Sequence, residues 1–439
     1  MMTSYKAVVP RELLHSRNVL LFNIGADKLW NSTAISVKDD VGNRLVSRIE
    51  EIGLLLAESE SIVILRRQPD EFLVNTFNAL GTFCKEILAP REYDETKTIT
   101  QLVLRDESLL SYLRTLSNYS LVPYAVTTYE EELAQKCNMK LVGPSSPLCC
   151  QINDKIHARS ISKNLGFTTC RGTICRYSNV ENCAMKLLED GVKKLVLKDR
   201  YGVSGNGMHF INNYSDLHRV RRIMRSDIER DWVIEEWCEN AIDLNFQLFI
   251  RGEEDYDLFL VTKQIIERGV YRGSETIVLS SNKMEEYLDQ VNILASYLIQ
   301  IGYRGIISVD SIITSDNVLI PIIEMNTRFS LSTFLVKIFT NHPDKIITSE
   351  IVNIYSSGIL TYEAILTELT NRSIAYSVLS RKGILITNSA TLPKEDYSIA
   401  GAYLGRLFVV LIGDTKNEVV ELKCKLEQLW YDMQIGIVE

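Results

Sequence analysis

The chain has 439 residues, of which 46% are hydrophobic and 24% are charged, as is typical of a globular protein with two or three domains. Its formal net charge of −8 argues against a general nucleic-acid binder and against a protein that binds anionic membranes. The nine cysteines form no CxxC pair, no apolar stretch is long enough to span a bilayer, and we expect no signal peptide. These features predict a cytoplasmic protein with reduced thiols.

Residues 1 to 148 show alternating strand and helix patterns, which predict an open α/β domain. The predicted strands are 18–24, 61–66, 98–103 and 121–125, and the predicted helices are 46–58 and 71–88. Gly25 follows the first strand and is interpreted as a plain turn residue, because a single glycine after a strand is weak support for a nucleotide loop.

Turn residues at 141–147 mark the end of this first domain. Asn153 or Asp154 is then expected to cap a helix that reaches Leu165 and ends at Gly166. Lys155 and Arg159 lie one turn apart on this helix, and by themselves such a pair indicates a solvated face.

A glycine-rich segment follows in the next part of the chain. Residues 195–198 read as a short strand that ends at Lys198, and the sequence YGVSGNG follows at 201–207. Residues 208–211 read as a returning strand, so the order is strand, loop and strand, whereas a helix follows the loop in a P-loop or a Rossmann motif. Glycines let backbone N–H groups turn towards a phosphate, and this pattern therefore indicates a lid that folds over phosphates.

Residues 232–238 form a predicted strand that continues into a linker, and such a segment can offer main-chain donors and acceptors to a purine edge. Asp243, just beyond it, is placed to accept hydrogen bonds from ribose hydroxyls. Two further strands, 246–250 and 258–263, are expected next, and residues 269–274 are expected to form an exposed loop.

The most informative stretch lies at residues 302–330. Two short strands are predicted, 306–313 and 318–324, joined by a polar turn at 314–317. On adjacent antiparallel strands Asp310 and Glu324 can point to the same face, and alternation keeps Asn326 on that side. Two carboxylates and an amide oxygen suit a magnesium ion, which fills its other positions with water and phosphate. Arg328 would bring a permanent positive charge to the same face.

The last part of the chain carries no catalytic constellation. It is predicted to be helical from residue 334 and at 346–356, to form strands at 377–386 and 402–412, and to end in an amphipathic helix at 418–431. We interpret it as a small α/β module that completes the substrate pocket or mediates association.

Together these features resemble the ATP-grasp superfamily over residues 141 to 332. The sequence IEMNTR at 323–328 is similar to the family's Glu-x-Asn-x-Arg strand end, and GPS at 143–145 with NDK at 153–155 is similar to the entry into its first nucleotide-binding subdomain. The resemblance implies a site of these residues: Lys155 and Lys198 at the phosphates; Ser204, Gly205 and Gly207 in the lid; Glu235, Glu236 and Cys238 at the adenine; Asp243 at the ribose; Asp310, Glu324 and Asn326 at magnesium; and Arg328, with Lys198, at the transferred phosphoryl group. Arg304 is a further catalytic candidate. Arg268, Arg272 and Ser330 are candidates for binding the substrate carboxylate or a phosphopantetheine phosphate.

The resemblance implies an α/β (α+β) chain with an ATP-grasp fold in four parts. These are an N-terminal pre-ATP-grasp domain (1–148), a first nucleotide-binding subdomain with the lid (149–235), a second subdomain with the metal site (236–345) and a C-terminal module (346–439). The implied cofactors are ATP and Mg²⁺.

The implied activity is an ADP-forming ligase that converts a carboxylate, expected to be an amino acid, into an acyl phosphate. The acceptor is an amine or the thiol of a carrier protein, as in the ligases of antibiotic biosynthesis, and the sequence leaves a homodimer open. The alternatives are another ATP-grasp phosphotransfer enzyme, a non-catalytic ATP-binding regulator, or a biotin carboxylase. The last is disfavoured because Lys263 and Gln264 reverse the Gln-Lys pair of that family, and because no biotin-carrier segment is present.

Overall fold

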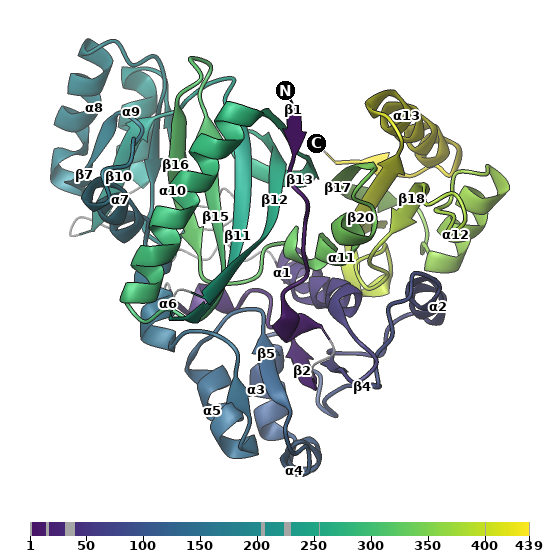
Figure 1. The fold of residues 1–439 in the computed structure, drawn as a ribbon. Helices are drawn as coiled ribbons and strands as arrows, with labels where there is room; N and C mark the ends of the chain where they lie inside the picture. Colours follow the sequence, from purple (N-terminus) through teal and green to yellow (C-terminus); the bar gives the residue numbers. More distant parts are fainter. Residues whose placement is uncertain are drawn as a thin grey trace. The chain divides into compact units, whose positions relative to one another are not determined.

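A computed structural model describes residues 2–14, 17–30, 40–202, 207–223, 230–253, 255–399 and 401–438. The chain divides into two compact units (Figure 1). Unit 1 consists of Met1–Ser4, Pro147–Tyr271 and Ile277–Thr327, and unit 2 consists of Tyr5–Ser146, Arg272–Thr276 and Arg328–Glu439. Both contain helices and β-sheets, so the predicted mixed α/β class is confirmed.

Unit 2 begins with the predicted open α/β layer, a parallel sheet in the order β4-β3-β2-β5-β6. Its strands are β2 (Asn18–Leu21), β3 (Ile62–Ile64), β4 (Glu86–Leu88), β5 (Ser120–Pro123) and β6 (Lys140–Leu141). Its helices are η1 (Arg11–Leu13), η2 (Ala26–Trp30), α1 (Asp40–Ser47), η3 (Arg48–Leu56), α2 (Glu71–Ala79), α3 (Ile99–Arg105), α4 (Glu107–Arg114) and α5 (Thr128–Cys137). Strands β2, β3 and β5 carry runs of buried apolar residues, as expected for a parallel sheet covered by helices.

Two predictions for this layer were wrong. The strand predicted at 98–103 is helix α3, because Thr98 and Gln101 form a reciprocal capping box that fixes a helix start. The helix predicted at 71–88 ends at Ala79 and is followed by strand β4, which pairs with β3.

Unit 1 contains a four-stranded antiparallel sheet in the order β7-β10-β8-β9. Its strands are β7 (Gly172–Arg176), β8 (Leu195–Lys198), β9 (Met208–Ile211) and β10 (Asp231–Glu236). The helices of this part are α6 (Ser146–Asn153), α7 (Lys155–Asn164), η4 (Tyr177–Asn179), α8 (Val180–Glu189) and α9 (Tyr214–Ile223). The predicted strand–loop–strand order around the glycine-rich segment is confirmed, since β8 and β9 pair directly.

The second sheet segment of unit 1 has the order β16-β15-β11-β12 and is also antiparallel. Its strands are β11 (Ile242–Gly252), β12 (Asp255–Glu267), β15 (Gly305–Ile313) and β16 (Leu319–Asn326). Helix α10 (Ser281–Gln300), which the sequence patterns did not reveal, lies along these strands in Figure 1. The hydroxyl groups of Tyr287 on α10 and Ser311 on β15 are 2.7 Å apart, which ties the helix to the sheet. A short pair, β1 (Met2–Ser4) with β14 (Val278–Ser280), completes the unit.

The rest of unit 2 is built on long antiparallel strands in the order β13-β17-β20-β18. The strands are β13 (Val270–Thr276), β17 (Ile346–Ser356), β18 (Gly383–Ile386), β19 (Ser398–Ile399), β20 (Ala402–Gly413) and β21 (Gly436–Ile437). The helices are η6 (Thr333–Leu335), α11 (Val336–Asn341), α12 (Tyr362–Asn371), η7 (Glu395–Tyr397) and α13 (Lys416–Asp432). The predicted strand at 402–412 and helix at 418–431 are confirmed.

Two predictions in this region were wrong as well. The helix predicted at 346–356 is strand β17, whose β-branched residues pair with β20 over its whole length. The loop predicted at 269–274 is the start of strand β13. Gly273 allows this pairing, because a Cβ atom there would lie 1.8 Å from the carbonyl oxygen of Ser349. Among the described residues, no helix is long and apolar enough to cross a membrane.

Candidate active site

Asp310 and Glu324 lie directly opposite each other on the antiparallel strands β15 and β16. Opposite residues of such a pair project from the same face of the sheet, so the arrangement predicted from the sequence is confirmed. Asn326 pairs with Ser308. Asn326 lies two residues after Glu324 on β16, so its side chain is on the same face of the sheet. A bulge directly after Asp310 disturbs the pairing there, a feature often found next to active sites.

Three side-chain amides hold the carboxylate of Asp310 in place. Asn245 and Gln264 donate to its Oδ1 at 2.8 and 2.9 Å, and Asn326 donates to its Oδ2 at 3.4 Å. Asn245 itself pairs with Asp310 across β11 and β15, and Gln247 donates to Asn245 at 3.0 Å. The sequence analysis did not include Asn245 or Gln264 in the site, although buried amides at alternate positions of an apolar strand were a usable signal.

This donor set fits a hard divalent cation. It offers two carboxylates and, from Asn326, an amide carbonyl oxygen, while the Asn326 amino group is engaged by Asp310. No group of three or more His, Cys, Asp or Glu side chains that could hold a metal occurs among the described residues. A cation bound here would therefore take the rest of its coordination from water and phosphate oxygens, as Mg²⁺ commonly does. When bound, it would neutralise charge on phosphate oxygens.

Lys155 lies beside these carboxylates. It occupies the first position of α7, where Asp154 is the N-cap and accepts a hydrogen bond from the backbone of Ile156 at 2.9 Å. Its Nζ donates to Glu324 Oε1 at 3.1 Å and to the carbonyl oxygen of Gly202 at 2.6 Å. The interpretation of Lys155 and Arg159 as a solvated pair was wrong, because both side chains are only 6% exposed.

A buried ion-pair network lies on β8 and β10. Lys198 ends β8 and donates to Glu235 Oε1 at 2.5 Å, and Arg159 NH1 donates to Glu235 Oε2, also at 2.5 Å. Burial alone would lower the pKa of Lys198, but its attraction to Glu235 outweighs burial and raises that pKa, with a smaller contribution from Glu324. Lys198 therefore stays positively charged near the carboxylates of β15 and β16.

The segment after β10 was predicted to contact an adenine. The thiols of Cys238 and Cys170 lie 3.9 Å apart, and this hydrogen bond lowers the pKa of Cys238 and raises that of Cys170. The backbone of Glu236 donates to the carbonyl of Arg171 at 2.7 Å. Burial raises the pKa of Asp243 to about 6, so this half-buried group exchanges a proton close to neutral pH.

A small pocket joins these groups. Its lining includes Lys155, Arg159, Cys170, Lys198 and Glu235, and two isoleucines of β16 close one side. Its free volume is about 10 Å³, room for about one water molecule. The ion pairs therefore occupy most of this pocket.

The glycine-rich lid is described only at its ends. Ser204 and Gly205 lie outside the described residues. Gly207 has φ +79°, and a Cβ atom at this position would lie 2.9 Å from the Cβ of Asp199, so the turn requires glycine. Its carbonyl accepts a hydrogen bond from the backbone of Asp199 at 2.8 Å.

The remaining candidates lie apart from this cluster or in unit 2. Arg304, at the start of β15, donates to the carbonyl of Tyr303 at 2.6 Å and lies against Gly252. Six residues separate it from Asp310, about 20 Å along a strand, so the structure does not bring Arg304 to the carboxylates. Arg268 lies exposed in a turn with φ +51°.

The candidates in unit 2 have contacts of their own. Arg328 NH1 donates to the Tyr124 hydroxyl at 2.7 Å, and its guanidinium lies 5.4 Å from the centre of that ring. The backbone N–H of Ser330 donates to Thr333 Oγ1 at 2.8 Å at the start of η6. Arg272 lies half-buried within β13.

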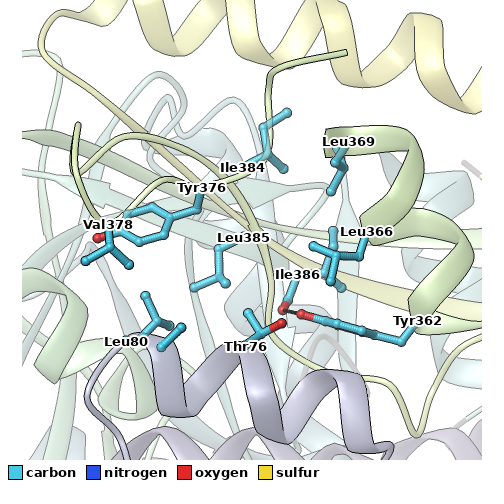
Figure 2. Close-up of a pocket in the computed structure, with 11 residues that line it drawn as sticks. Thr76, Leu80, Tyr362, Leu366, Leu369, Tyr376, Val378, Ile384, Leu385 and Ile386 are labelled. Atoms are coloured by element: carbon cyan, nitrogen blue, oxygen red, sulfur yellow. Dashed lines mark hydrogen bonds between the residues drawn. The ribbon is translucent and has the colours of Figure 1, made fainter. Parts of the chain in front are cut away.

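A larger pocket of about 170 Å³ lies in unit 2 between α2, α12 and β18 (Figure 2). Its lining is mainly leucine and isoleucine, and the hydroxyl of Tyr362 already donates to the carbonyl of Ile386 at 3.1 Å. The Tyr376 hydroxyl is hydrogen-bonded to His342 at 2.8 Å. The lining includes no charged side chain, so this pocket is unsuited to phosphate chemistry despite its size.

Comparison with known proteins agrees with this geometry. Residues 152–332 match a family model described as an ATP-grasp domain. Over 331 residues the chain is 28% identical to a butirosin acyl-carrier protein–L-glutamate ligase of Niallia circulans, covering 74% of this chain and 75% of that protein.

Two solved structures show the same fold over nearly the whole chain. An ADP complex of N5-carboxyaminoimidazole ribonucleotide synthetase has a TM-score of 0.55 at 12% identity and covers 98% of this chain and 99% of its own. A biotin carboxylase from Campylobacter jejuni, solved as a β,γ-ATP complex, has a TM-score of 0.57 at 14% identity and covers 98% and 94%. The predicted ATP-grasp fold is therefore confirmed.

Proposed function

Because this chain carries an ATP-grasp domain and is an ADP-forming ATP-grasp ligase, we propose that it activates the carboxylate of an amino acid as an acyl phosphate. The acyl group is then transferred to the thiol of a carrier protein, in the biosynthesis of a specialised metabolite. One observation carries the proposal. The opposed carboxylates of Asp310 and Glu324 lie on β15 and β16, the buried Lys155 contacts Glu324, and a second buried lysine, Lys198, belongs to the same unit.

Within this proposal the nucleotide binds to unit 1. Lys155 and Lys198 contact its phosphates together with the glycine-rich lid, the segment from Glu235 to Cys238 holds the adenine, and Asp243 accepts from the ribose. Asp310, Glu324 and Asn326 hold Mg²⁺. The buried position of both lysines supports these roles, because a cation removed from water attracts phosphate more strongly.

The reaction has two steps. An oxygen of the substrate carboxylate attacks the γ-phosphorus, the bond to the β–γ bridging oxygen breaks, and ADP leaves. The acceptor sulfur then attacks the acyl carbon, the carbon–oxygen bond to phosphate breaks, and the thiol proton passes to the released phosphate or to water. We propose that Lys198 and Arg328 stabilise charge on the transferred phosphoryl group, which is electrostatic catalysis without a covalent protein nucleophile.

The choice of a thiol acceptor rests on the relative from Niallia circulans, whose name states that it is an acyl-carrier protein–L-glutamate ligase. A free amine remains the second candidate acceptor. The two are separated by incubating the protein with ATP, Mg²⁺ and a panel of amino acids, with and without a phosphopantetheinylated carrier protein.

The readouts are ADP, phosphate and the intact mass of the carrier. We expect ADP and phosphate in equal amounts, together with a carrier whose mass has increased by one aminoacyl group. Product that forms only with an added amine would assign an amide ligase. ADP without any ligated product would indicate phosphotransfer, and the absence of ADP would overturn the enzyme assignment.

A further inference from the structure

A buried arginine in unit 2 has no hydrogen-bond or ion-pair partner for its side chain among the described residues. Arg48 starts η3, its side chain is 4% exposed, and its guanidinium makes no hydrogen bond or ion pair to the described residues. A charged group held away from water without an acceptor is costly, and it is normally paired or binds a ligand. The Nε donor of Arg48 is therefore buried without an acceptor among the described residues.

The neighbouring carboxylates of Glu50 and Glu51 attract Arg48 through space, but their hydrogen bonds go to other groups. Glu50 accepts a hydrogen bond from the backbone of Arg66 at 2.5 Å. Glu51 accepts from the backbone of Ser389 at 2.5 Å and of Ala390 at 2.7 Å. These contacts anchor η3 between the end of β3 and the segment that leads to η7. Burial also raises the pKa of Glu50 to about 7, which weakens its negative charge at neutral pH.

A second cation, which has no hydrogen bond or ion pair among the described residues, lies on the segment that Glu51 anchors. The ammonium group of Lys394 is 5.3 Å from the centre of the Tyr397 ring and makes no hydrogen bond or ion pair within the described part of the chain. Burial lowers the pKa of Lys394, and repulsion by Arg48 lowers it further, so the two charges act on each other. Arg67, 4.0 Å from the centre of the Tyr93 ring, also repels Lys394 but is itself paired with Asp396 at 2.8 Å.

The position of this cluster in the fold agrees with a ligand site. Arg66 and Arg67 lie two and three residues beyond Ile64, the carboxyl end of β3 in the parallel sheet. In open α/β sheets, ligands bind outside the carboxyl ends of the strands, where the connecting loops converge. Arg48 and Lys394, which make no ion pair among the described residues, lie near this edge through Glu50 and Glu51, and this arrangement resembles a site for an oxyanion.

We propose that Arg48 and Lys394 bind the oxyanion of a substrate: the carboxylate of a dicarboxylic amino acid that is not activated, or the phosphate of the carrier's phosphopantetheine arm. This inference rests on the proposed function for the identity of the ligand. A guanidinium offers two parallel N–H donors to either group, and the ammonium adds a second positive charge.

The test compares the wild-type protein, Lys394→Met and the control Lys425→Met, which removes an exposed lysine of the same unit. Michaelis constants are measured for the amino acid, the carrier protein and ATP. For Lys394→Met we expect the constant for one of the first two to rise at least tenfold while that for ATP stays unchanged. A rise with the amino acid assigns its carboxylate, and a rise with the carrier assigns the phosphate. Unchanged constants for both would overturn the proposal.

A ligand-binding measurement tests the inference without turnover. Thermal unfolding is followed with added sodium glutamate or phosphopantetheine at constant ionic strength. Stabilisation of the wild type that is lost in Lys394→Met and in Arg48→Met supports the site; equal stabilisation in all proteins, or none in the wild type, refutes it. If no ligated product forms with the wild type, the proposed function fails, and this arm still decides the anion site.

Discussion

Replacement of Glu235 by glutamine tests the buried network directly. Glu235 is the shared acceptor of Lys198 and Arg159, and all three side chains are less than 10% exposed. Glutamine keeps the size of the side chain but has only one acceptor oxygen for the two cations. Its amino group is a donor, so it faces the second cation without accepting a hydrogen bond from it. At least one buried cation then loses its acceptor.

The expected loss follows from this geometry. Breaking a buried ion pair by removal of one partner costs about 3–5 kcal/mol of folding free energy, a factor of about 10² to 10⁴ in the folding equilibrium. Without the carboxylate, burial lowers the pKa of Lys198 unopposed by its strongest partner. Affinity for ATP should therefore fall together with stability, because the proposed phosphate contact loses its charge.

The measurement is urea unfolding followed by the fluorescence of Trp232 and Trp237, which lie on and directly after β10, with ATP binding measured by calorimetry. The control is Glu189→Gln at the end of α8, because Glu189 is exposed, belongs to the same unit and makes no ion pair among the described residues. An unfolding midpoint and ATP affinity of Glu235→Gln equal to those of Glu189→Gln would refute the reasoning.

Three further outcomes are expected. Glu324→Gln should lower kcat about 100-fold, equivalent to about 3 kcal/mol, because one of two metal carboxylates is lost, whereas Asp316→Asn in the exposed β15–β16 turn should leave kcat unchanged. Burial raises the pKa of Asp243 from 3.8 to about 6, so the folded state holds this proton more tightly than the unfolded state. In urea unfolding, the wild type should therefore lose up to about 3 kcal/mol of stability as pH rises from about 4 to 6, and Asp243→Asn should abolish this loss. Iodoacetamide should modify Cys238, whose pKa is lowered, more slowly when ATP is present, while the exposed Cys424 reacts equally under both conditions, as peptide mass spectrometry would show.

The metal-binding hairpin was predictable because its signals are local. Two β-branched runs joined by a polar turn specify a hairpin, and the period of two then decides which side chains share a face. The opposition of Asp310 and Glu324 follows from that register alone. The same holds for α7, whose cap at Asp154 and stop at Gly166 lie within the helix's own sequence.

The errors arose where distant segments decide the structure. Residues 346–356 carry apolar side chains that fit a helical spacing, but pairing with β20 makes them a strand. The strand predicted at 98–103 is a different case, because the signal that makes it a helix, the capping box of Thr98 and Gln101, is local. The burial of Lys155 and Arg159 could not be predicted from α7 itself, since their partners Glu324 and Glu235 lie 169 and 76 residues away in sequence.

The charges of the site bear on how its ligands enter. Lys155 is paired with Glu324, Lys198 and Arg159 share Glu235, and Asp310 lies opposite Glu324, so these six side chains carry three charges of each sign. A polyphosphate entering alone would add uncompensated negative charge beside Asp310 and Glu324, and a divalent cation entering alone would compete with Lys155 for Glu324. A divalent cation held by the carboxylates would free Lys155 to pair with phosphate and would cancel part of the charge of the triphosphate. Joint binding therefore brings less unbalanced charge into the site than either ligand alone, in a region where such charge is expensive.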